Sequence, residues 1–95
     1  IDPETRSAQQ RGISLNLAPR EFDLLYALMN NAGKVVSTED LLAQVWGAEF
    51  EGQPQVVYVH IRWLRQKLEE DAQKPRRILT VRGYGYKFAG SEDRG

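Results

Sequence analysis

Residues 55–68, QVVYVHIRWLRQKL, constrain the fold of this chain more than any other segment, because their apolar side chains recur at helical spacing. At about 100° per residue the apolar positions fall within ~40° of the first of them, which predicts a helix with one narrow buried stripe. The stripe consists of Val57, Ile61, Leu64 and Leu68, and the opposite face consists of Gln55, Val59, Arg62 and Gln66. Such a helix needs other elements against its stripe and leaves the opposite face exposed.

Val59 is the exception on that outward face, because a helix that meets only water gains nothing from an aliphatic side chain there. Single exposed apolar residues are nevertheless common on protein surfaces. The sequence therefore leaves two interpretations open: an ordinary solvated face, or a face that contacts a partner.

Two further helices are predicted upstream. Pro19 suits the first helical position, and the negative charge of Glu21 in the first turn interacts favourably with the positive end of the helix dipole. A Ser-Thr-Glu-Asp run beginning at Ser37 has the pattern of a capping box, in which Asp40 reaches back to the cap. Apolar residues at helical spacing follow each start, and Gly47 ends the second helix.

Strands are predicted at both ends of the chain. Residues 13–17 alternate apolar and polar side chains, as a half-buried strand does, and a short strand is expected near residues 5–9. Residues 78–81 and 86–88 are β-prone runs separated by Arg-Gly-Tyr-Gly, the pattern of a hairpin. The order strand, three helices, hairpin predicts an α+β winged helix-turn-helix with the hairpin as its wing.

The composition describes a globular domain and narrows the function classes. With 41% hydrophobic and 27% charged residues, no apolar run approaches the ~18 residues of a membrane span. The absence of cysteine excludes a disulfide framework and thiolate chemistry, and a cytoplasmic location is expected. No export signal is visible at the amino end.

The formal net charge of zero hides a strong polarity. Residues 1–53 hold four Lys or Arg against eight Asp or Glu, whereas residues 54–88 hold eight against three. A domain charged in this way can present one face to a polyanion and another to a protein.

The predicted third helix and the hairpin supply candidate contacts to double-stranded DNA. We expect Arg62 and Arg65 to reach phosphates, with Gln55, Val56, Val59 and Trp63 nearer the base edges. Arg82 in the glycine-rich turn is expected in the minor groove. Thr80 and Tyr86 would add neutral phosphate contacts. The alternative is a charged helix and a hairpin tip that serve only solubility.

Other polar residues carry weaker signals. His60 has no cysteine or second histidine beside it, so we predict no metal site and no catalytic role for it. Trp46 is expected in the core or at a phosphate. Glu49 and Glu51 lie in the loop of residues 47–53 and suit either solvent or a protein partner.

Three ordered motifs give a family resemblance: LAPREFDLLYALMNNAGKVVSTEDLLAQVWG, VHIRWLRQKLEEDAQKP and ILTVRGYGYKF. Together, over about residues 13–88, they resemble the effector domain of OmpR/PhoB-type bacterial response regulators. The resemblance implies an amino-terminal antiparallel sheet, a DNA recognition helix, a wing, and no enzymatic activity or cofactor. It also implies a single domain with residues 1–11 as a truncated strand or linker, 12–88 as the core and 89–95 as a tail.

The resemblance further implies a phosphorylatable receiver domain upstream, tandem head-to-tail binding to direct-repeat DNA by a domain that is monomeric alone, and contact of the Glu49/Glu51 loop with RNA polymerase. Carried over position by position, the DNA contacts fall into three groups. The recognition helix supplies Gln55, Val56, Tyr58, Val59, His60, Arg62, Trp63, Arg65 and Gln66; the wing supplies Thr80, Arg82 and Tyr86; Trp46 adds a phosphate contact.

The departures from the family pattern concern base reading. Residues 55–60 read Gln-Val-Val-Tyr-Val-His where members often show Arg-Thr-Val-Asp-Val-His, and Trp63 stands where Arg or Tyr is frequent. Ala18 replaces the usual hydroxyl cap of the first helix, a loss of about 1 kcal/mol of helix stability. The best-known base preferences of the family therefore do not transfer to this chain.

Two other function classes remain as alternatives. One is a winged-helix module that binds protein and never DNA, which the neutral overall charge favours. The other is a small hydrolase that uses His60, which the lack of a partner residue disfavours.

Overall fold

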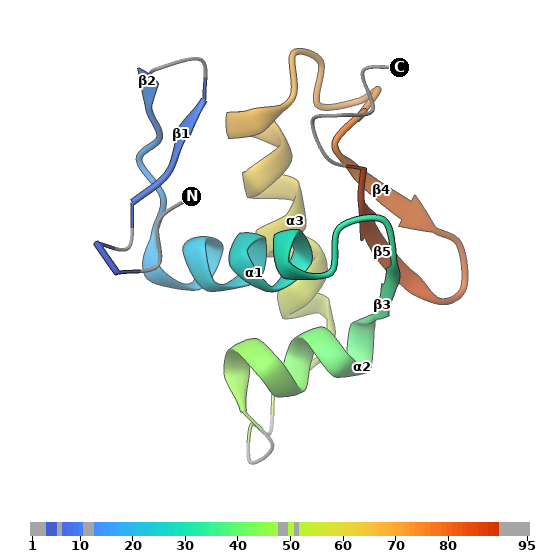
Figure 1. The fold of residues 1–95 in the computed structure, drawn as a ribbon. Helices are drawn as coiled ribbons and strands as arrows, with labels where there is room; N and C mark the ends of the chain where they lie inside the picture. Colours follow the sequence, from blue (N-terminus) through green and yellow to red (C-terminus); the bar gives the residue numbers. More distant parts are fainter. Residues whose placement is uncertain (1–3, 6, 11–12, 48–49, 51, 90–95) are drawn as a thin grey trace.

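The computed structural model describes residues 4–5, 7–10, 13–47, 50 and 52–89 of the 95-residue chain. The elements in chain order are β1 (Gln9–Gln10), β2 (Ile13–Ser14), α1 (Pro19–Asn30), β3 (Val35–Ser37), α2 (Thr38–Leu41), a π-helical turn η1 (Leu42–Trp46), α3 (Gln55–Leu68), β4 (Ile78–Val81) and β5 (Gly85–Phe88). The helices lie between a two-stranded sheet, β1–β2, and a three-stranded sheet, β3–β5–β4 (Figure 1).

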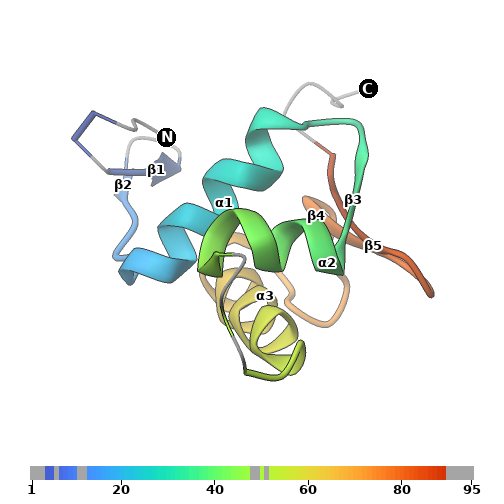
Figure 2. The ribbon, with the colours of Figure 1, turned by 90° about the horizontal axis from the view of Figure 1, so that it is seen from below.

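The view from below shows the same order, with the β1–β2 hairpin and the three-stranded sheet on opposite sides of the helices (Figure 2). The predicted α+β architecture of three helices, an amino-terminal antiparallel sheet and a carboxy-terminal hairpin is confirmed. Within the described part of the chain, no helix combines the length and the apolar character that a membrane crossing requires.

The amino-terminal strands are shorter than the sequence predicts. The expected strand over residues 13–17 is wrong beyond Ser14, and the expected strand near residues 5–9 lies instead at Gln9–Gln10. Leu15 still donates its N–H to the carbonyl of Ala8 at 2.8 Å. The alternation of apolar and polar residues at positions 15–17 arises because Leu15 and Leu17 pack against the core. It does not require a longer strand.

Helix α1 begins without a side-chain cap, as the alanine at position 18 requires. The Glu21 carboxylate compensates in part, because its Oε1 accepts the N–H of Ala18 at 2.8 Å. The same oxygen accepts from Nζ of Lys67 on α3 at 2.5 Å, and Nζ also donates to the carbonyl of Asn16 at 2.8 Å. The start of α1 is thereby tied to the last turns of α3.

Helix α2 begins where the sequence predicts. The Ser37 Oγ accepts the N–H of Asp40 at 3.0 Å, which is the expected N-cap. The π-helical turn that follows was not predicted, since periodicity of apolar residues does not distinguish it from α-helix over five positions. Gly47 then ends the segment with a φ of 101°.

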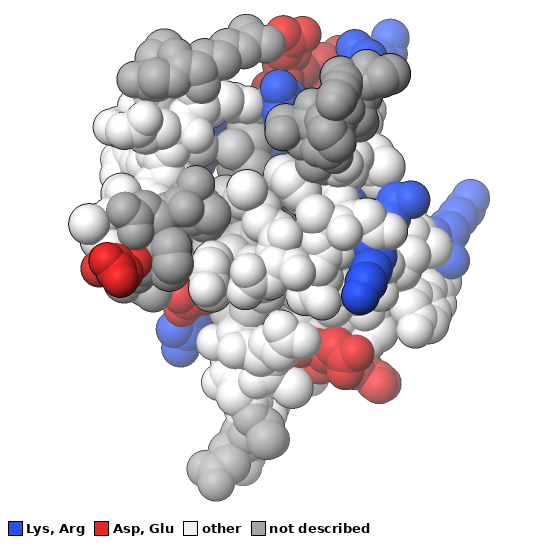
Figure 3. Space-filling view, viewed as in Figure 1, with Lys and Arg blue, Asp and Glu red and all other residues white. Residues whose placement is uncertain are grey.

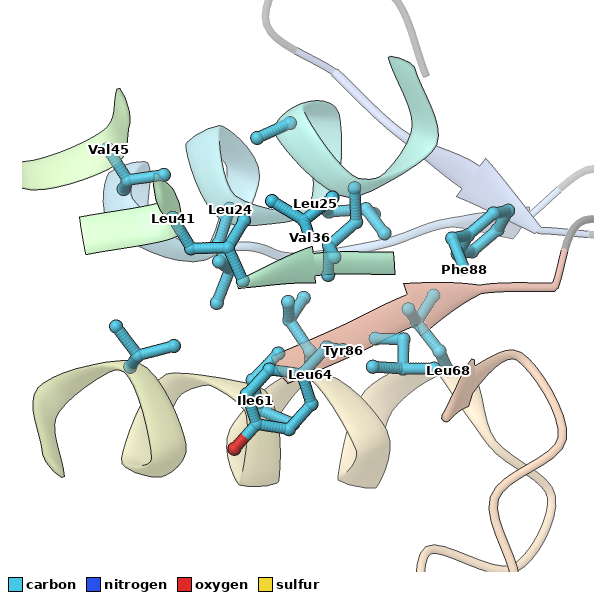
Figure 4. Close-up of a cluster of buried hydrophobic side chains, with 14 residues drawn as sticks. Leu24, Leu25, Val36, Leu41, Val45, Ile61, Leu64, Leu68, Tyr86 and Phe88 are labelled. Carbon is cyan, nitrogen blue, oxygen red and sulfur yellow. The ribbon is translucent and has the colours of Figure 1, made fainter. Parts of the chain in front are cut away.

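The core forms where α1, α3 and β5 meet (Figure 4). Figure 4 shows Ile61, Leu64 and Leu68 on the α3 side and Leu24 and Leu25 on the α1 side, with Tyr86 of β5 beside α3 and Phe88 of β5 nearer α1. Each such buried side chain contributes about 1.5–3 kcal/mol relative to exposure. The predicted stripe of α3 is confirmed.

The three-stranded sheet carries the wing. Strand β5 pairs antiparallel with both neighbours: Gly85 lies opposite Ser37 of β3 and opposite Val81 of β4. The sequence did not predict β3, which is only three residues long. Since β3 immediately precedes α2, the sheet also fixes where the second helix begins.

A buried carboxylate holds the loop between α3 and β4. Glu69 directly follows α3, and its side chain is 1% exposed. Its Oε1 accepts the N–H of Arg76 at 2.9 Å, and its Oε2 accepts those of Arg77 and Ile78, both at 2.9 Å. The loop that leads into the wing is thus fastened to the end of α3.

Candidate nucleic-acid interface

Helix α3 presents its outer face because its inner stripe is fully packed. Val57, Ile61 and Leu64 are 0% exposed, so the side chains about half a turn away point out of the protein. Of the nine residues predicted to contact DNA from this helix, five are exposed: Gln55, Tyr58, Arg62, Trp63 and Gln66. The other four are partly buried: Val56, Val59, His60 and Arg65.

One flank of α3 carries an aromatic cluster. The His60 ring lies between Trp46 and Trp63, with centroid distances of 5.0 and 4.9 Å. Its Nδ1–H donates to the carbonyl of Val56 at 2.8 Å, which fixes the ring orientation. Phe50 extends the cluster, 6.3 Å from Trp46. His60 therefore packs between two indoles, and the described residues contain no cluster of acidic or histidine side chains that could hold a metal ion.

Trp46 and Trp63 differ in their exposure. Trp63 is 44% exposed, whereas Trp46 is half-buried against His60 at the end of the π-helical turn. The predicted polymerase-contact residues Glu49 and Glu51 lie outside the described residues.

The other flank of α3 faces the wing. Arg82 and Gly83 are in the exposed turn between β4 and β5, and Gly83 adopts a φ of 75° that favours glycine. Thr80 is exposed on β4, opposite Tyr86 on β5. The wing thus presents Arg82 at its tip and Thr80 nearer α3.

Tyr86 is more deeply placed than a surface contact would be. The residue is 8% exposed, and burial raises the pKa of its phenol above the ordinary tyrosine value, although the charge of Arg65 opposes the shift. A phosphate contact by Tyr86 would use its hydroxyl alone.

The raised pKa of Tyr86 predicts an alkaline effect on stability. A group whose pKa is higher in the folded state stabilises the fold below the unfolded-state pKa, and that contribution is lost as pH rises through the folded-state pKa. We expect an absorbance titration that follows tyrosinate formation to show one phase at a pH above the ordinary range of tyrosine pKa values. Tyr86→Phe should remove that phase. Tyr84→Phe, on the exposed turn, should leave that phase in place; its disappearance there would contradict the assignment.

Two hollows border the predicted contact residues. One of about 400 Å³ lies between α3 and the following loop and is lined by Tyr58, Arg62, Arg65, Gln66, Ala72, Gln73 and Pro75. The other, of about 490 Å³, lies between the start of α2 and the wing. Sequence reasoning did not find Gln73, because a loop without periodicity gives no sign of which helix it borders.

Charge is unevenly spread over the surface. The face in front in Figure 3 is mostly uncharged, and its few Lys and Arg side chains do not merge into one basic area. Helix α1 lies in front and α3 behind it in this orientation (Figure 1). Among the described residues, the α1 side therefore shows no large basic area.

Comparisons with known proteins agree with this geometry. Residues 12–88 match the family described as transcriptional regulatory protein, C terminal. The sensory transduction protein RegX3 of Mycolicibacterium smegmatis is 41% identical over 90 residues, which are 95% of this chain and 40% of RegX3. The chain spans well under half the length of the curated relatives it matches.

Two solved structures have the same fold. The response regulator DrrB, a Thermotoga maritima OmpR/PhoB homologue, superposes with a TM-score of 0.87 at 39% identity, covering 95% of this chain and 41% of DrrB. The RstA DNA-binding domain of Klebsiella pneumoniae, solved in complex with the RstA box, gives a TM-score of 0.84 at 38% identity, covering 94% of this chain and 88% of that one.

Proposed function

Since this chain belongs to the family of transcriptional regulatory protein C-terminal domains, the effector domains of OmpR/PhoB-type response regulators, we propose that it binds double-stranded DNA sequence-specifically, with α3 in the major groove and the wing in the minor groove. The members of this family are DNA-binding domains and not enzymes. The observation that carries the proposal is the packing of α3, whose buried stripe leaves Gln55, Arg62 and Gln66 exposed on one face.

The roles of the individual residues follow from their chemistry. Arg62 is exposed and suits a phosphate, where charge gives most of the affinity and its salt dependence. Gln55 and Gln66 offer amide groups that can pair with adenine, and Val59 offers methyl groups for thymine. Trp46 and Thr80 supply donors for neutral phosphate contacts, as does the hydroxyl of Tyr86.

We also propose the wider setting that the resemblance implies. The domain acts in the cytoplasm as a monomer that pairs head to tail on direct repeats, and the loop with Glu49 and Glu51 contacts RNA polymerase. An upstream receiver domain supplies the control.

Selection from a random duplex library, followed by salt titration on the enriched sequence, tests the proposal. We expect a direct repeat with half-sites about one helical turn apart, and affinity that falls by roughly one logarithmic unit per tenfold salt for each phosphate contacted. Failure to enrich any duplex, with no salt-dependent binding, would instead favour the protein-interaction alternative.

Arg82 provides a sharper prediction. Arg82→Ala should weaken binding to sites with A·T-rich flanks by about tenfold, and to sites with G·C-rich flanks much less, because a narrow A·T minor groove concentrates negative potential. Fluorescence anisotropy on the two duplexes measures both. Lys34→Ala is the matched control, since it removes one charge just before β3, at the end of the sheet far from the turn. Equal losses on both flanks would contradict the minor-groove assignment.

A further inference from the structure

Arg65 lies on α3 between the buried stripe and the exposed face, and its guanidinium is engaged within the protein. Nε and Nη2 donate to the carbonyl of Ile78 at 3.1 and 2.8 Å, and Nη2 also donates to the Thr80 Oγ1 at 2.8 Å. Both acceptors belong to β4. The guanidinium carbon is 6.0 Å from the ring centroid of Tyr86 on β5. One side chain of α3 therefore contacts both strands of the wing.

Arg62 offers a direct comparison, because it lies three positions earlier on the same helix. It is exposed, and its guanidinium has no hydrogen-bond or ion-pair partner among the residues that the structure describes. A guanidinium binds phosphate best with two parallel N–H groups along one edge. Arg65 uses its Nε–Nη2 edge on β4, so the two arginines differ in what they can offer a ligand.

Because Arg65 binds atoms of β4, its substitution would disturb this strand and the turn that follows it. The Ile78 residue is 0% exposed and begins β4, whose other end leads into the turn that holds Arg82. Glu69, which directly follows α3, holds the same residue by accepting its N–H. Arg65 and Glu69 therefore both tie the first residue of β4 to the carboxy-terminal end of α3, and Arg65 alone also binds Thr80.

We propose that Arg65 is a positioning residue that couples the wing to the recognition helix, so that minor-groove reading by Arg82 depends on it. The proposal rests on the proposed function, because it assigns a role within DNA recognition. It differs from the sequence-based expectation that Arg65 acts as a phosphate ligand.

A charge-conserving variant of Arg65, compared with a charge-removing variant of Arg62, separates positioning from phosphate binding. Arg65→Lys keeps the charge but lacks the fork that spans Ile78 and Thr80. We expect it to retain the salt slope of the wild type while the preference for A·T-rich over G·C-rich flanks falls by about fivefold or more. The matched Arg62→Gln should lower the salt slope by about one and leave the flank preference unchanged.

A double-mutant cycle with Arg82→Ala measures the coupling directly. If Arg65 acts through the wing, the loss of affinity that Arg65→Lys causes on A·T-flanked duplexes should be about fivefold smaller in the Arg82→Ala background than in the wild type, a coupling of ~1 kcal/mol. Additive effects, or a wild-type flank preference in Arg65→Lys combined with a lower salt slope in Arg65→Gln, would overturn the proposal.

A measurement without DNA keeps this proposal distinct from the proposed function. In the free protein, Arg65→Lys should speed amide hydrogen exchange in β4 and at Tyr84, whose N–H binds the Val81 carbonyl, about tenfold more than in α1. Thr80→Val should do so in part, and Thr80→Ser should not. Unchanged or uniformly faster exchange would overturn the coupling, whether or not the wild type binds any duplex.

Discussion

Replacing Glu69 by alanine should lower the free energy of unfolding by about 3–5 kcal/mol, and the melting temperature by roughly 15 °C or more. The carboxylate is buried and accepts the backbone N–H groups of Arg76, Arg77 and Ile78. The alanine side chain would leave these donors without their acceptor in a partly buried loop, and hydrogen bonds to a charged group are among the stronger ones. Denaturant and thermal unfolding followed by circular dichroism measure the loss.

Two companion variants show what the loss is due to. Glu69→Gln keeps the shape and one accepting oxygen, so it should fall between the wild type and the alanine variant. Glu70→Ala removes an exposed carboxylate at the next position and should change stability by less than about 1 kcal/mol. Equal losses for Glu69→Ala and Glu70→Ala would show that the buried hydrogen bonds do not stabilise the loop.

Gly85→Ala should be destabilising by about 3 kcal/mol, because the added methyl group would collide with backbone. A Cβ at this position would overlap the carbonyl oxygen of Val36 and lie 2.7 Å from the Cα of Ser37, both on β3. Backbone atoms of a paired strand cannot rotate away as a side chain can, so β3 and β5 must separate. Chemical unfolding gives the cost, and amide shifts of β3 show whether the pairing is lost.

Gly83→Ala is the matched control two positions earlier in the wing. Its Cβ would meet no atom within 4 Å, but the φ of 75° is unfavourable for alanine by about 1 kcal/mol. The two substitutions add the same methyl group and differ in the obstacle it meets. If Gly83→Ala proved as costly as Gly85→Ala, the close approach of β3 and β5 could not be the reason.

The helices could be predicted because their signals are local. The stripe of α3, the proline at the start of α1 and the cap at Ser37 each depend on residues a few positions apart. Strand β3 could not be predicted in the same way, because a strand of three residues has too little alternation, and its partner β5 is distant in the chain.

The candidate interface shows the same division. Helical spacing identified the outward face of α3 from the sequence, but it could not distinguish Arg62 from Arg65, which are the same residue type on neighbouring faces. Their difference arises because β4 lies against one of them. Glu69 shows the same limit for a residue that stabilises the fold. An acidic run after a helix predicts side chains exposed to solvent, and only the path of the following loop shows that Glu69 is buried.

The pairing of β5 with two strands has a consequence for the order of folding. Val81 and Gly85 of the hairpin are close in sequence, whereas Val35 of β3 pairs with Lys87 across α2, the π-helical turn and α3. Contacts between distant residues carry a larger loop-closure entropy and form after local ones. Pairing within the wing therefore closes a short loop, whereas attaching the wing to β3 must also offset the entropy of closing a loop that contains α2 and α3.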